Sequence, residues 1–270
     1  MHNEKKNANP NAILYGYYAF AVVLLAVYVY VYQFAPLPGD WNDVVVNFIT
    51  PLASFCTAFI ATAVLRNYHP EDRPRAVWMC LAVGSWLWFL GDAIYSVYVF
   101  LYGDVPNPSI ADISWVIGML LFIAAFYYQY AIIMPAQKTS IQYVVYGATL
   151  LTFIAPALVL QLLGIFTFGD YINYYYPPTE LLIGIAGLAL LRIFQGGALT
   201  RPWIGLVAFS VADLLYAWAD QTGAYSFSVE SGNPLSLIID ATYIAAYLIM
   251  AWGFLSHWVL LNYGARGRRK

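Results

Sequence analysis

Two carboxylates set among apolar residues, Asp92 and Asp112, are the side chains of this sequence best placed to do chemistry. They flank a short turn rich in Pro, Gly and Asn within residues 86–118, and no Lys or Arg occurs in that stretch. A weaker version of the same pattern surrounds Asp213 and Asp240. Because an ionisable group inside a membrane is costly unless it is solvated or paired, these four positions indicate a functional polar site.

Aromatic residues follow all four of these carboxylates at a spacing of three, which places each pair on one face of a helix. The combination favours an acidic and aromatic ligand-binding pocket. Its candidate residues are Asp92, Tyr95, Asp112, Trp115, Asp213, Tyr216 and Asp240, with Glu180 and Asp220 as secondary candidates.

Helix capping is a competing interpretation for some of the carboxylates. Asp112, Glu180 and Asp240 each follow Pro, Ser or Thr at the expected start of a helix, where a negative side chain stabilises free N–H groups and meets the dipole. For these three, capping and ligand binding explain the pattern equally well. Asp92 and Asp213 are expected inside helices, so a polar network is favoured there. Without a nearby base, either several carboxylates are protonated or a cation or water-filled pocket serves them.

The composition excludes an ordinary soluble protein, because 62% of the residues are hydrophobic and only 10% are charged, against about a quarter charged in soluble domains. Eight apolar runs approach the roughly 20 residues that span a bilayer as a helix. We therefore predict an all-α membrane protein, a bundle of eight transmembrane helices forming one domain over residues 1–270 with a basic tail at 262–270. The runs cover roughly 12–34, 44–65, 77–101, 110–134, 141–163, 180–195, 202–224 and 235–261, and the sixth, the shortest, could start nearer position 174.

The basic residues determine the expected orientation. Cytoplasmic loops of membrane proteins carry an excess of Lys and Arg, and an eight-span alternation places every basic residue of this chain on one side. Both termini are therefore expected in the cytoplasm, and the protein in the cell membrane. The residues concerned are Lys5, Lys6, Arg66, Arg73, Arg75, Lys138, Arg192, Arg201, Arg266, Arg268, Arg269 and Lys270.

A weak similarity between the two halves of the chain indicates an internal repeat of residues 12–134 and 141–261. Each half would hold four spans in the same orientation, a parallel repeat of the kind that builds sites between halves in some transporters. The competing interpretation is chance similarity between apolar helices that contain Asp and aromatic residues. The matches are Gly91-Asp92-x-x-Tyr95 with Ala212-Asp213-x-x-Tyr216, and Asp112-x-x-Trp115 with Asp240-x-x-Tyr243.

Other kinds of chemistry lack the residues they need. The sequence has no His/Cys cluster for zinc, no Gly-rich loop with Lys-Ser/Thr for phosphate and no Gly-x-Ser-x-Gly nucleophile motif. No Lys falls inside a span to form a Schiff base. An oxygen-ligand site for a hard cation, built from four carboxylates, remains chemically open. No enzymatic activity, metal site or nucleic-acid partner is predicted, and no cofactor can be assigned.

The stretch around the first two carboxylates resembles a known kind of membrane region. Gly91-Asp92-Ala-Ile-Tyr95, then Gly103, then Pro108-Ser109-Ile-Ala-Asp112-Ile-Ser-Trp115 is similar to the region ahead of the catalytic domains of some bacterial and archaeal diguanylate cyclases (GGDEF) and sensor histidine kinases. The resemblance covers about 30 residues. It implies a multi-span prokaryotic sensory module. Only a short basic tail follows the last run, so we expect signalling through a cytoplasmic or membrane partner.

Two hypotheses of function follow. The leading one is a stand-alone, non-enzymatic sensor or ligand-binding protein of the lipid bilayer, with its pocket in the outer half of the bundle. The alternative is a small cation- or proton-coupled transporter that uses the same carboxylates.

Overall fold

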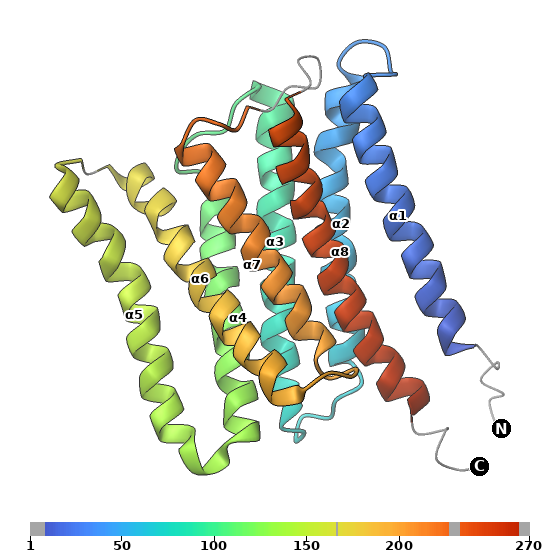
Figure 1. Cartoon of the computed structure of the whole chain (residues 1–270), viewed down its shortest axis with the longest axis vertical. Coiled ribbons are helices and arrows are strands. Elements are labelled where there is room, and N and C mark those ends of the chain that lie inside the picture. Colours follow the sequence, from blue (N-terminus) through green and yellow to red (C-terminus); the bar gives the residue numbers. More distant parts are fainter. Residues whose placement is uncertain (1–8, 166, 227–232, 265–270) are drawn as a thin grey trace.

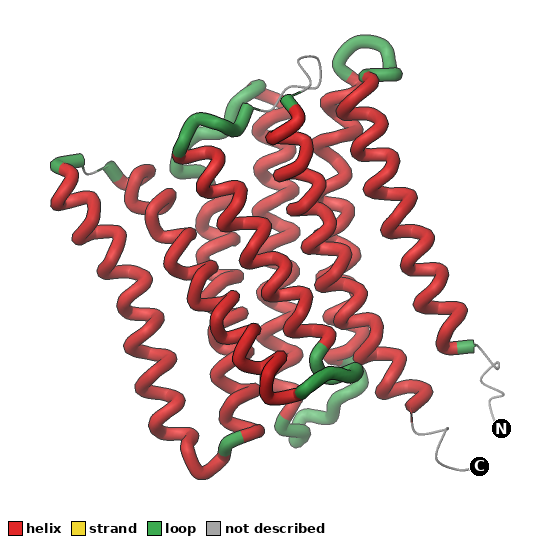
Figure 2. The backbone as a smooth tube through the Cα atoms, viewed as in Figure 1, coloured by secondary structure: helices red, strands yellow, loops and turns green. Residues whose placement is uncertain are grey.

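A computed structural model describes residues 9–165, 167–226 and 233–264. These residues form eight long α-helices and one short 3-10 turn, with no strand among them (Figure 2). Each of the eight is long and apolar enough to cross a membrane, which confirms the prediction of an all-α, eight-helix architecture. The elements are α1 (Pro10–Phe34), α2 (Trp41–Leu65), α3 (Pro74–Tyr102), α4 (Ile110–Ile133), η1 (Pro135–Gln137), α5 (Lys138–Leu163), α6 (Phe168–Phe194), α7 (Arg201–Gln221) and α8 (Pro234–Tyr263).

The helices run alternately up and down, so the bundle has two distinct ends (Figure 1). α1 begins and α8 ends at one of them, which we call the termini end, and the opposite one is the far end. Every basic residue that the structure describes lies at or near the termini end: Arg66, Arg73, Arg75, Lys138, Arg192 and Arg201. The remaining basic residues, which include those of the expected tail, lie outside the described residues: Lys5, Lys6, Arg266, Arg268, Arg269 and Lys270.

The sixth helix differs most from the sequence-based expectation. α6 begins at Phe168, where Thr167 caps it by accepting from the Asp170 N–H, and it continues through Pro177 and Pro178. The proline pair suggested a helix start, but transmembrane helices tolerate Pro because neighbouring groups satisfy the freed carbonyls. Glu180 therefore lies in the middle of a helix, so its interpretation as a helix cap at the outer start of a span is wrong.

Close packing of helix pairs positions the aromatic rings of the bundle. A methyl group added at Gly91 of α3 would overlap the Trp115 indole of α4, and one added at Gly118 of α4 would overlap the Trp88 indole of α3. Gly205 of α7 packs in the same way against the backbone of α8. Small residues allow transmembrane helices to approach closely, and here the glycines of α3 and α4 also hold two tryptophan rings in place.

The contacts between helices follow the same order in both halves of the chain. In the first half α1 contacts α2, α2 contacts α3 and α3 contacts α4, and α5 to α8 repeat this series. Between the halves, the α2–α8 contact has its counterpart in α6–α4, and the α1–α8 contact in α5–α4. α3 and α7 occupy equivalent positions at the centre.

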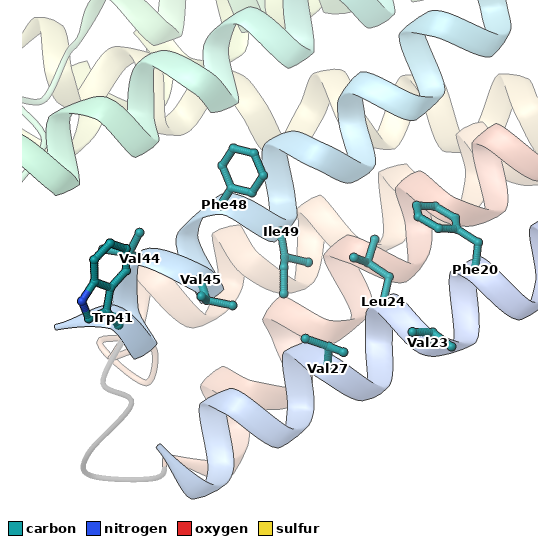
Figure 3. Close-up of a pocket in the computed structure, with 9 residues that line it drawn as sticks. All are labelled: Phe20, Val23, Leu24, Val27, Trp41, Val44, Val45, Phe48 and Ile49. Atoms are coloured by element: carbon teal, nitrogen blue, oxygen red, sulfur yellow. The ribbon is translucent and has the colours of Figure 1, made fainter. Parts of the chain in front are cut away.

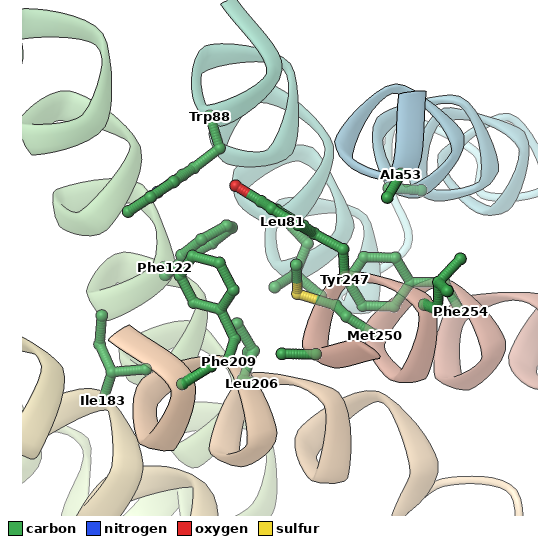
Figure 4. Close-up of a cluster of buried hydrophobic side chains, with 14 of the residues drawn as sticks. Ala53, Leu81, Trp88, Phe122, Ile183, Leu206, Phe209, Tyr247, Met250 and Phe254 are labelled. Atoms are coloured by element: carbon green, nitrogen blue, oxygen red, sulfur yellow. The ribbon is translucent and has the colours of Figure 1, made fainter. Parts of the chain in front are cut away.

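A packed apolar cluster fills the bundle toward the termini end. Phe209 of α7 packs edge-on against Trp88 of α3, with ring centroids 4.6 Å apart, and against Phe122 of α4 at 6.4 Å. Figure 4 shows how these side chains pack against one another. Other buried members of the cluster include Leu81, Leu206, Met250 and Phe254.

Candidate functional site

A cavity of about 510 Å³ brings together most of the residues singled out by the sequence. Its walls come from both halves of the chain, with side chains from α1, α2, α3, α4, α6, α7 and α8. The lining also includes residues 103–107 of the α3–α4 connection at the far end. Among the residues that line it are all seven primary candidates and one secondary candidate: Asp92, Tyr95, Asp112, Trp115, Asp213, Tyr216, Asp240 and Asp220.

Asp92 lies inside α3 and is 5% exposed, at the wall of the cavity. Its Oδ1 accepts a hydrogen bond of 3.2 Å from the indole N–H of Trp115, the ring that packs on Gly91. Its Oδ2 has no hydrogen-bond partner among the described residues, although the hydroxyls of Tyr247 and Ser54 face the same carboxyl group. One strong acceptor of this carboxylate is therefore unused.

Asp213 lies inside α7, on the other half of the chain, and is 8% exposed. It lines the same cavity as Asp92, and it lies close enough to be affected by the charge of Asp92. The hydroxyl of Tyr243 faces Asp213. The two span-interior carboxylates, which the sequence ranked above the others, thus share one cavity.

Asp112 and Asp240 already have several hydrogen-bond donors. Asp112 accepts from the Ser109 N–H at 2.7 Å, which confirms its predicted capping role, and also from the Tyr176 hydroxyl at 2.7 Å. Asp240 accepts from the hydroxyls of Tyr28 at 3.0 Å and Tyr225 at 2.9 Å. The capping interpretation is wrong for Asp240, because α8 is capped by Asn233 and the carboxylate lies in its second turn. The hydrogen bonds of both carboxylates therefore stabilise the wall of the cavity.

Tyr225 comes from the α7–α8 connection, outside the helices. Burial, and then the adjacent Asp240, raise the pKa of its phenol. The hydroxyl therefore stays protonated at ordinary pH and keeps donating to Asp240. This contact ties the connection to the cavity wall.

Glu180 is the one candidate that does not line the cavity. It is fully buried in the middle of α6, neither side-chain oxygen has a hydrogen-bond partner among the described residues, and Asp213 is the charge that acts on it. Asp213 thus has the cavity on one side and a second carboxyl group within electrostatic range.

The sequence reasoning missed several cavity residues. Tyr243 stood in the repeat pattern and could have been added to the site on that basis. Tyr28 and Tyr225 could not, because tertiary packing alone brings α1 and the α7–α8 connection to Asp240. Tyr176 was missed because the start of α6 was placed too late. The missed residues also include Trp88 and Asp104.

The carboxylates are arranged as separate groups. Among the described residues, no three His, Cys, Asp or Glu side chains come close enough to hold a metal ion. The oxygen-ligand cation site that the sequence left open is therefore not formed. No Lys, Arg or His among the described residues lines the cavity either, so the site combines several carboxyl groups with aromatic walls.

Two other features of the structure lie outside this cavity and do not contribute to the candidate site. An apolar hollow of about 290 Å³ between α1 and α2 is lined by residues such as Phe20, Val27 and Phe48, with no group able to do chemistry (Figure 3). At the termini end, the Tyr68 hydroxyl and His257 Nε2 lie 2.8 Å apart and Arg75 donates to the Tyr68 carbonyl at 2.7 Å. Those contacts fasten the α2–α3 connection to α8.

No protein-family model, curated protein or solved structure matches this chain.

Proposed function

We propose that this chain is an eight-span integral membrane protein with its termini end in the cytoplasm, and that its cavity opens to the outer side. The eight apolar helices support membrane insertion. The described basic residues gather at the termini end, as is typical of cytoplasmic loops, whereas the cavity lining near the far end includes Asp104 and Asp220. The matching order of helix contacts supports a parallel four-plus-four repeat with the cavity between its halves.

We infer that the protein is a sensor that binds a small ligand in this cavity. The observation that carries the inference is the convergence of Asp92 and Asp213, one from each half, on a single cavity with an unused acceptor. A volume of about 510 Å³ lies within the range of roughly 300–1,000 Å³ typical of small-molecule sites. Buried polar groups are normally hydrogen-bonded, so a ligand that donates to Asp92 would complete the site.

Aromatic rings on the termini side of the cavity connect a bound ligand to the packing of the central helices. Trp88 lines the cavity and packs edge-on against Phe209, whose ring lies 5.2 Å from that of Tyr247. A ligand that displaces Trp88 would therefore change the contact between α3 and α7, the two central helices. Such a change could be passed to a signalling partner at the termini end.

A cation- or proton-coupled carrier is the second candidate, and the position of Glu180 favours it. A carboxyl group beyond Asp213 could accept a proton from the cavity side. The packed cluster toward the termini end, with Phe122, Met250 and Phe254 fully buried, closes the cavity on that side, an arrangement that fits both a sensor and a carrier that faces outward.

Ion flux in liposomes separates the two functions. We expect purified protein, reconstituted in liposomes loaded with a dye sensitive to H⁺, Na⁺ or K⁺, to show no flux above empty liposomes under a gradient of the corresponding ion. A wild-type flux that disappears in both Asp92→Asn and Asp213→Asn, but persists in Asp40→Asn at an exposed site outside the cavity, would overturn the sensor in favour of the carrier.

A further inference from the structure

We propose that the ligand of the cavity is a protonated primary amine with an apolar or aromatic tail, its ammonium group held between Asp92 and Asp213. This inference rests on the proposed ligand-binding function and adds the chemical class of the ligand. Four features of the cavity carry it: the unused acceptor, the charge, the spacing of the carboxylates and the aromatic walls.

The hydrogen bonds already made separate the carboxylates into two groups. Asp112 and Asp240 each accept from two side-chain hydroxyls of the protein, so their oxygens are engaged. Asp92 accepts one hydrogen bond, from Trp115; its buried Oδ2 accepts none, although the hydroxyls of Tyr247 and Ser54 face the same carboxyl group. The missing partner of a carboxylate oxygen is a donor, which an ammonium N–H supplies and a quaternary ammonium cannot.

The charge of the cavity selects a cation. Its described lining contains no basic residue and six aspartates, Asp92, Asp104, Asp112, Asp213, Asp220 and Asp240. An anion would be repelled by every aspartate that is ionised, whereas a bound cation would keep the buried carboxyl groups in their charged form. Oppositely charged walls in a low-dielectric cleft also concentrate the matching ion.

The spacing of the carboxylates favours an organic cation over a metal ion. Hard divalent cations need several oxygens gathered within their coordination shell. No such group of three forms among the described residues. An ammonium group needs only one or two acceptors, each reached by a directed N–H, which matches two separate carboxylates facing one space.

The aromatic walls complete the recognition of an organic cation. Tyr95 packs beside Trp115 with ring centroids 6.0 Å apart, and Tyr216 lies 6.4 Å from Tyr243 on the opposite half. All four residues line the cavity. Aromatic faces attract cations and pack on apolar tails, so they would hold both parts of an amine that carries an organic tail.

Calorimetric titration of the full-length protein in lipid nanodiscs tests this class with 2-phenylethylamine as the probe. We expect it to bind, and its neutral counterpart 2-phenylethanol to bind at least about tenfold more weakly, because the alcohol lacks the charge. The N,N,N-trimethyl derivative should also bind more weakly than the amine, because it has no N–H to donate. Asp92→Asn and Asp213→Asn should each weaken amine binding by at least about tenfold, and Asp40→Asn should leave it unchanged.

Several results would overturn the amine assignment. If the wild-type protein bound the amine and the alcohol equally well, the assignment would be overturned. This test does not depend on the folding of any variant. Amine binding that survives in both aspartate variants would place the amine elsewhere. A third result uses Ser96→Cys, which places a thiol in the lining of the cavity. Failure of the amine to bind, when a cationic thiol reagent still modifies this cysteine from the outer side, would overturn the ligand class while leaving the ligand-binding function standing.

Discussion

Replacing Gly205 by Ala is expected to lower the thermal unfolding midpoint of the protein in detergent strongly. The added methyl group would overlap the Cα of Met250, and a helix backbone cannot move aside as a flexible side chain does. α7 and α8 would have to separate, and overpacking of a well-packed site costs typically about 1–3 kcal/mol. Because these helices carry Asp213 and Asp240, the same change should disturb the cavity.

Gly147→Ala is the matched control, because it makes the same chemical change in α5 where nothing lies within 4 Å of the new methyl group. Ala is favoured over Gly in a helix by about 1 kcal/mol, so this variant should be as stable as the wild type or slightly more stable. Equal unfolding midpoints for the two variants would show that α7 and α8 are not packed as closely as described.

Replacing Glu180 by Met is expected to stabilise the protein. The carboxyl group is fully buried and neither oxygen has a hydrogen-bond partner among the described residues. A buried polar group left unsatisfied costs about 1–3 kcal/mol, and Met fills a similar volume without it. The unfolding midpoint should therefore rise, as measured by intrinsic fluorescence in detergent.

Glu180→Gln is the companion variant, because it keeps the shape and the polarity of the side chain and should gain less stability than Glu180→Met. A loss of stability in Glu180→Met would mean that the carboxyl group has a partner essential to the fold. The same variant should leave amine binding close to wild type, because Glu180 does not line the cavity. It would abolish proton flux if the protein were a carrier.

Much of the fold could be predicted because the length and hydropathy of the apolar runs determine the number and type of the helices. An apolar run of about 20 residues has few alternatives to a membrane-spanning helix, and eight such helices are present. The start of α6 was mistaken because Pro177 and Pro178 suggest that a helix begins just after them, and only the three-dimensional structure shows that the helix continues through them.

The residues of the site that could be predicted are those whose burial in an apolar helix is energetically costly. Asp92 and Asp213 stand out in sequence because no local role explains a carboxylate inside an apolar helix. The partners of Asp240 did not stand out, since Tyr28 is 212 residues away along the chain and Tyr225 follows a helix in an irregular connection. A tyrosine in an apolar helix is ordinary, so only the three-dimensional arrangement shows which ones line the cavity.

The central claim is that an electronegative cavity opens to the outer side, and the reaction of a cysteine at Ser96 tests it most directly. Ser96 lines the cavity from α3, and Ser96→Cys would be made in a background with Cys56 and Cys80 replaced by Ala. Membrane-impermeant methanethiosulfonates, one cationic and one anionic, would be added to the outside of intact cells. Pro38→Cys, in the exposed α1–α2 connection at the same end, is the control.

The account predicts that the cationic reagent modifies Ser96→Cys at least about tenfold faster than the anionic one, because a charged cleft enriches the matching ion by 10-fold or more. This preference should shrink when Asp92→Asn or Asp213→Asn is added, and it should be small at Pro38→Cys. Equal rates with both reagents at Ser96→Cys, or reaction only from the cytoplasmic side, would contradict the account.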